Sequence, residues 1–276
     1  MIKIIDMDKL FDKYISDFVY SNIGKVNPDE IENQIPKLYE QFGDKPLAEL
    51  DGKTPNQYYA SFGGEELVEC LKSHLTQGVE VSDFLCEALQ NNPDNERVLI
   101  DCLYQDNDEE LTLYLMNMLD ALDSKACVQR YLEFILWDYS EPIKELATEI
   151  LCRNCELVKD ACLKAYKEST ASVRVYLTQI LSYCKNDDAV FDVLVNEFIA
   201  NPTEIPTYAN YLARYSDERA LPFLIASIEN EKINYQDFEE LRYAIEALGG
   251  TYDKQRDFTA DKIYKKIKAQ KETPEV

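Results

Sequence analysis

The chain has 276 residues, 46% of them apolar and 11% aromatic, so it is long and apolar enough to build a core. Its 52 acidic residues outnumber 29 Lys and Arg, and the net charge of −23 excludes a protein that binds nucleic-acid phosphates over most of its surface. The 8 glycines are too few for Gly-rich phosphate loops or for the many tight turns of an all-β protein. The composition therefore predicts an all-α protein.

The beginning of the chain predicts a helical N-terminal capping region. Apolar residues recur on one face of the first helix: Phe11, Tyr14, Ile15, Phe18 and Val19. A second helix is predicted to begin at the N-cap Asn27, to kink at Pro36 and to end at Gly43, and a short third helix follows the cap Thr54. We interpret residues 1–62 as an element that covers the open end of a stack of helices, with a separate functional domain as the alternative.

Helical patterns then recur with a period of 31 residues, which is typical of stacked helical hairpins. Five copies are spaced by 31 residues and a sixth is displaced by 35: 81–91, 112–122, 143–153, 174–184, 205–215 and 240–250. Two positions four residues apart share a helical face in every copy. They predict two buried columns: Phe84, Leu115, Leu146, Leu177, Tyr208, Tyr243 and Ala88, Leu119, Ile150, Leu181, Leu212, Ala247.

Partner helices between these copies carry their own apolar column: Leu71, Leu103, Leu132, Leu163, Leu194 and Leu224. Two helices per period make a helical hairpin, which cannot bury its apolar faces alone. Stacking six hairpins over residues 63–252 would bury them in one continuous core.

The last copy resembles a known family. Residues 217–224 read Asp-Glu-Arg-Ala-Leu-Pro-Phe-Leu, and residues 240–249 read Glu-Leu-Arg-Tyr-Ala-Ile-Glu-Ala-Leu-Gly. Together they resemble the HEAT-like repeat, of the short bacterial kind also found in phycobilin lyases, and the spacing extends the resemblance over about residues 64–250. The resemblance implies an α-α superhelix, a HEAT-like solenoid whose second helices line a concave face. It implies no reaction, because such repeats serve many unrelated functions.

The C-terminal region, residues 253–276, differs from the acidic body. Residues 254–271 carry a net charge of +5. We expect one more helix beginning near Asp261 and then a disordered polar tail. The basic segment is expected to fold back on the acidic body, with nucleic-acid binding through the tail as the less favoured alternative.

The cysteines raise the question of a metal or redox site. Cys152 and Cys155 form a C-x-x-C, and with Cys162 and Cys184 they could supply four thiolates to zinc. The repeat register argues against such a site. Three cysteines lie beside a repeat leucine in the same slot of the first helices: Cys70, Cys102 and Cys162. We interpret these thiols as small buried core groups and expect no metal.

Catalytic residues are hard to find in this sequence. His74 is the only histidine and is expected to serve the end of its helix. The acidic run 106–110 lacks the Gly and Glu of a calcium-binding loop and is interpreted as a helix N-terminus. We therefore predict no catalytic residue and no cofactor.

The start of the chain carries a charged residue every few positions, and no window approaches 18 consecutive apolar residues. Eight cysteines in a chain of this length, without a signal peptide, are predicted to be reduced thiols. These features predict a cytoplasmic protein with no membrane contact.

The remaining face of the second helices is the candidate binding site. Its polar column could hydrogen-bond an extended peptide, as the asparagine ladder does in the related armadillo repeats, and its tyrosines could give rigid contacts. The alternative for each residue is a solvated or gap-filling side chain. The candidate residues are Tyr114, Asn117, Met118, Glu145, Thr148, Glu149, Tyr176, Gln179, Tyr183, Asn210, Tyr211 and Arg214.

The sequence thus predicts a non-catalytic protein-interaction module that binds a basic or extended partner, for example as an inhibitor or immunity-type protein. The alternative is an enzyme or enzyme subunit of the HEAT-like lyase type, acting on a protein or a chromophore. A HEAT-like DNA glycosylase is a third possibility. It would need a basic groove, whereas residues 61–253 carry a net charge of −22.

Overall fold

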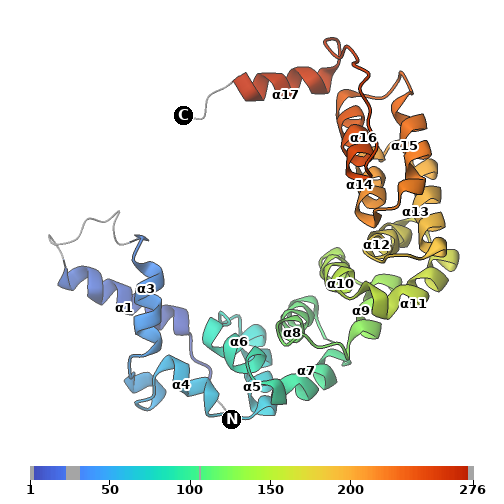
Figure 1. Cartoon of the computed structure of the whole chain (residues 1–276). Coiled ribbons are helices and arrows are strands. Elements are labelled where there is room, and N and C mark those ends of the chain that lie inside the picture. The colour runs from blue at the N-terminus through green and yellow to red at the C-terminus, as the bar shows by residue number, and fades with distance from the viewer. Residues whose placement is uncertain (1–2, 23–31, 106, 273–276) are drawn as a thin grey trace. The chain divides into compact units, whose positions relative to one another are not determined.

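A computed structural model describes residues 3–22, 32–105 and 107–272. Within these ranges the secondary structure is entirely helical, so the predicted all-α class is confirmed (Figure 1). The predicted helix start at Asn27 and the end of the predicted tail, residues 273–276, lie outside the described residues. The chain divides into two compact units, Met1–Cys127 and Val128–Val276, and each is described by itself.

In the described residues, the first unit begins with helices that precede the repeat helices and pack on one another. Its elements are α1 (Met7–Ser21), α3 (Ile35–Gly43), η1 (Ala48–Leu50), α4 (Pro55–Ala60), α5 (Gly64–Gln77), α6 (Asp83–Gln90), η2 (Pro93–Asn95), α7 (Glu96–Leu103) and α8 (Glu109–Ala121). Helix α1 packs on α3, and α3 and α4 reach α6. Phe42 is fully buried, with its ring 5.3 Å from that of Phe11 and 6.1 Å from that of Phe84.

Local signals explain where these N-terminal helices begin and end. Thr54 caps α4 by accepting from the backbone N–H of Gln57, whose side chain reaches back to Thr54 in a capping box. Helix α3 ends at Gly43 as predicted. In place of the kink predicted at Pro36 the helix is interrupted just before it. Glu32 is helical, residues 33–34 form a turn, and α3 begins at Ile35, so that Pro36 lies in the first turn, where its missing N–H costs no hydrogen bond.

His74 joins the start of the chain to α5. Its ring is fully buried, with Nδ1 2.8 Å from the carbonyl oxygen of Cys70 and Nε2 3.3 Å from that of Ile5. The first contact lies within the last turns of its own helix, as predicted. The second was not predicted, and it ties the segment before α1 to the repeat helices.

The second unit repeats the helical hairpin. Its elements are α9 (Val128–Leu136), α10 (Glu141–Arg153), α11 (Cys155–Glu168), α12 (Ala171–Leu181), α13 (Asp188–Ala200), α14 (Ile205–Tyr215), η3 (Glu218–Ala220), α15 (Leu221–Ile228), α16 (Tyr235–Ala247) and α17 (Lys262–Glu272). Within this unit α12, α14 and α16 follow one another on one side and α13 and α15 on the other (Figure 1). Most helices that follow one another in the chain pack on each other, and α10 also packs on α12 and α14 on α16.

The predicted core columns are buried in most copies. Leu115, Leu177 and Leu181 are fully inaccessible, and the partner-helix leucines are buried except for the half-buried Leu163. The last copy was misplaced by one residue: Tyr243 is 62% exposed, and Leu248 is buried in place of Ala247.

The connection before α16 explains this shift. Asn234 caps the helix by accepting from the backbone N–H of Asp237, which sets where α16 begins. Ala244 then takes the position equivalent to Tyr208, an offset of 36 residues rather than 35. The residue at which α16 begins thus determines which of its side chains are buried. The apolar pattern alone did not locate that residue.

The basic segment after α16 folds back on the acidic unit, as expected. Lys254 lies 2.7 Å from a carboxylate oxygen of Glu229, and the Arg256 guanidinium donates to the carbonyl oxygens of Ile228 and Asn230. These bonds fix the chain against the end of α15.

Candidate interaction face of the second helices

Three helices of the second unit present accessible side chains on one side. They lie on α10, on α12 with the turn after it, and on α14, and neighbours three or four residues apart share a helix face. We call this set the ladder face: Glu145, Glu149, Tyr176, Gln179, Tyr183, Thr207, Asn210 and Arg214.

Tyr176 is positioned by the preceding repeat. Its hydroxyl donates to the carboxylate of Glu141 at the start of α10. Burial and, after it, this carboxylate raise the pKa of Tyr176 to about 12, so the hydroxyl stays protonated at neutral pH. Glu141 was not among the predicted site residues. The signal was available, because Glu141 lies four residues before Glu145 and thus near the same helix face.

Arg214 is held between two tyrosines. Its guanidinium carbon lies 4.4 Å from the ring centre of Tyr183 and 5.6 Å from that of Tyr211, and Nη1 donates to the buried Ser182 hydroxyl at 3.2 Å. Burial raises the pKa of Tyr211 to about 12. Stacking on aromatic faces fixes the arginine and orients the exposed edge of Tyr183.

Three polar side chains of the ladder face have no hydrogen bond to another side chain or backbone group in the described parts of the chain. Glu145 and Asn210 are exposed and Gln179 is half-buried. They lie on three consecutive second helices, α10, α12 and α14. Each therefore offers free donors or acceptors to a partner.

Three of the predicted candidates are not accessible. Met118 is 1% exposed, Thr148 is 2% exposed and Tyr211 is 8% exposed. Thr148 donates to the carbonyl oxygen of Lys144 in its own helix, which satisfies the hydroxyl inside the core. The predicted polar ladder is thus interrupted on α10, where the exposed residues are Glu145 and Glu149.

The first unit carries the other two candidates on α8. Tyr114 is half-buried, and burial raises its pKa, while Asn117 is exposed. They form a smaller accessible patch of their own unit, beside the exposed Asp83 and Glu87 of α6.

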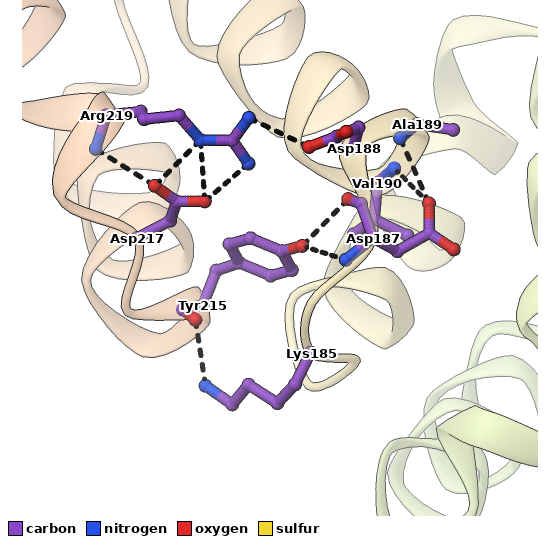
Figure 2. Close-up of polar contacts among 8 residues, drawn as sticks. All are labelled: Lys185, Asp187, Asp188, Ala189, Val190, Tyr215, Asp217 and Arg219. Carbon is purple, nitrogen blue, oxygen red and sulfur yellow. Dashed lines mark hydrogen bonds and ion pairs between the residues drawn. The ribbon is translucent and has the colours of Figure 1, made fainter.

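A polar network fixes the turn that follows α12 to the end of α14 (Figure 2). The Tyr215 hydroxyl accepts from the backbone N–H of Asp187 and donates to its carbonyl oxygen, both at 2.8 Å. The Asp187 side chain caps α13, and Lys185 donates to the carbonyl oxygen of Tyr215. The Arg219 guanidinium donates to both carboxylate oxygens of Asp217 and, at 2.8 Å, to a carboxylate oxygen of Asp188. The network positions α12 and α14, which carry the ladder face.

The cysteines beside this network gather more closely than the sequence indicated. Cys152, Cys162 and Cys184 are buried in one region, and their mutual proximity adds to the effect of burial in raising the pKa of the last two thiols. Cys155 begins α11, and its sulfur atom lies within 4.8 Å of that of Cys184. Every cysteine in the described residues is a free thiol.

No helix in the described ranges is long and apolar enough to cross a membrane. No family model, no curated protein and no solved structure matches this chain.

Proposed function

We propose that the chain is a non-catalytic protein-interaction module of the HEAT-like superhelical type, and that its ladder face binds an extended, basic segment of a partner protein. The observation that carries the proposal is a set of polar side chains without internal hydrogen bonds, one on each of the second helices α10, α12 and α14. Glu145, Gln179 and Asn210 make no internal side-chain hydrogen bond among the described residues. Spaced along one row of helices, such groups suit an extended main chain better than a compact ligand.

The helix arrangement supports a superhelix. A period of 31 residues, two rows of helices within the second unit and packing between consecutive helices are the features of stacked hairpins. In that arrangement α10, α12 and α14 would present the ladder face along one continuous surface.

Charge favours a basic partner. Glu145 and Glu149 on α10 are exposed, and the Glu141 carboxylate lies at the N-terminal end of the same helix. The cations nearby are engaged: Arg153 pairs with Glu149 at 2.9 Å, and Arg214 lies between its tyrosines. Opposite charges accelerate encounter, whereas like charges reject unsuitable partners.

The binding test uses the full chain and two fluorescent twelve-residue peptides, one alternating Lys and Gly and the other Glu and Gly. Anisotropy should show binding of the Lys peptide, at least tenfold weaker binding of the Glu peptide, and weaker binding of the Lys peptide at higher salt. We expect Asn210→Ala and Glu145→Gln each to weaken binding roughly threefold to tenfold, the range that one net hydrogen bond allows.

The matched control is Asp192→Asn, which removes one exposed charge from α13 in the other row of helices. It should leave the affinity for the Lys peptide unchanged within about twofold, because a single exposed charge away from the ladder face contributes little. Equal binding by the ladder-face variants and the original chain, or an equal loss with Asp192→Asn, would show that the ladder face is not the site.

A further inference from the structure

A small cluster in the second unit has the composition of a metal site. The sulfur atoms of Cys155 and Cys184 and a carboxylate oxygen of Glu156 all lie within 4.8 Å of one another. Cys155 and Cys184 are buried, at 7% and 0% exposed, whereas 57% of the Glu156 side chain is exposed. The cluster therefore has a buried sulfur side and an open carboxylate side.

The carboxylate is held in place from two directions. One Glu156 oxygen accepts from the backbone N–H of Lys185 at 3.2 Å, and the other lies 3.4 Å from the ammonium nitrogen of Lys159. Lys159 also pairs with Asp187 at 3.2 Å. Carboxylates fixed in this way by further hydrogen bonds are typical of ligand groups in metal sites.

The loop that carries Cys184 is anchored on both sides. Arg214 donates to Ser182 before it, and Lys185 after it donates to the carbonyl oxygen of Tyr215. Asp187, at the far end of the loop, is bound through its backbone by the Tyr215 hydroxyl (Figure 2). The position of the Cys184 sulfur is thus set by the fold.

Two thiols and one carboxylate suit a divalent cation that accepts sulfur and oxygen ligands. In a tetrahedral zinc site with Zn–S of about 2.3 Å, neighbouring ligand atoms lie roughly 3.5–3.8 Å apart. Distances in the cluster would need to shorten by at most about 1.3 Å to reach that spacing. Cys155 is the first residue of α11, where the helix dipole favours negative charge.

A divalent cation would offset most of the charge of the cluster. Two thiolates and one carboxylate carry three negative charges, of which Zn²⁺ neutralises two, and Lys159, shared with Asp187, lies beside the Glu156 carboxylate.

We propose that Cys155, Cys184 and Glu156 bind one Zn²⁺ ion, with water in the fourth position on the exposed Glu156 side. Binding breaks two S–H bonds, forms two sulfur–metal bonds and releases two protons to solvent, and no electron is transferred. The ion would join the start of α11 to the loop after α12. This site shares no ligand residue with the ladder face.

The test is a titration of the reduced full chain with Co²⁺, followed by Zn²⁺. We expect one equivalent of Co²⁺ to produce thiolate-to-metal charge-transfer absorbance and Zn²⁺ to displace it. Cys155→Ser and Cys184→Ser should weaken Co²⁺ binding by at least a hundredfold, and Glu156→Gln by roughly tenfold to a hundredfold. The control Cys86→Ser, which changes a thiol of the first unit, should bind as the original chain does.

A measurement on the unaltered chain avoids any loss of folding in the variants. Alkylation with iodoacetamide, read by mass spectrometry of the peptides, should be slowed by Zn²⁺ at Cys155 and Cys184 and unchanged at Cys152. Absence of the charge-transfer band, or equal alkylation of Cys155 and Cys184 with and without Zn²⁺, would overturn the proposal. Loss of binding in Cys162→Ala as large as in Cys155→Ser would overturn the three-residue ligand set.

Discussion

The contacts that hold each unit together internally differ between the two units. In the second unit, polar side chains repeatedly reach one repeat along the chain, as in Tyr166 to Glu197, Asp187 to Tyr215 and Asp188 to Arg219. In the described part of the first unit the comparable side-chain bond is Lys72 to Gln105, at 3.5 Å and exposed. Aromatic packing and the buried His74 hold that unit instead.

This difference separates two roles of the repeat. In both units the apolar columns bury side chains in a core. The polar bonds of the second unit fix how one helical hairpin packs on the next. The comparison predicts that core substitutions affect the units alike and that polar substitutions affect the second unit more.

The largest effects should come from equivalent core positions. Leu115 and Leu177 belong to the same predicted column and are both 0% exposed. Leu115→Ala and Leu177→Ala should each lower the free energy of unfolding of their own unit by about 2–5 kcal/mol. Hydrogen exchange measured by mass spectrometry would assign each loss to its unit.

The control is Leu157→Ala, because this leucine is 59% exposed and its substitution should change stability by less than about 0.5 kcal/mol. A cost at Leu157 similar to that at Leu177 would contradict the assigned core.

Intermediate effects should separate the two units. Tyr215→Phe removes the hydroxyl that bonds both backbone groups of Asp187, and we expect a loss of about 1–3 kcal/mol in urea unfolding. Tyr58→Phe is the matched change in the first unit, where the hydroxyl makes one long bond of 3.4 Å to the carbonyl oxygen of Lys3. Its cost should be smaller, and the reverse order would refute the contrast between the units.

The smallest effect concerns acid stability. Hydrogen bonds from Arg219 lower the pKa of Asp217 below its usual value of 3.8. The folded state therefore gains stability above that pH and loses it as the pH falls through the lowered pKa. Asp217→Asn should lower the melting temperature at pH 7 by less than Tyr215→Phe does, and the difference from the original chain should shrink below about pH 4. A difference that grows on acidification would contradict this assignment.

The apolar period was predictable because burial requires a regular spacing, and Leu177 shows the result. The start of α16 was not predictable from the apolar pattern, because the connection before this helix carries no such pattern. The cap at Asn234 begins the helix one residue later than the sequence predicted. Thr148 shows the limit of reading polarity from residue type, because a hydroxyl that bonds its own helix can be buried.

The polar network lay beyond sequence reasoning. Arg219 reaches Asp188, 31 residues earlier, through a choice of side-chain rotamers that spacing alone does not determine. The sequence analysis considered Cys155 and Cys184 among four possible zinc ligands, but the grouping of these two thiols with Glu156 was not predictable, for a related reason. Cys184 follows a helix and Cys155 begins one, and only the packing of α11 beside α12 brings their sulfur atoms together.

The segment that follows α16 has a consequence for assembly. Tyr252 and Phe258 lay their rings against Phe238, and Tyr264 lies against Tyr235. The side of α16 that another helix would need for packing is therefore already occupied by the same polypeptide. A second copy of the chain that extended the row of helices at this end would first have to displace these three aromatic contacts.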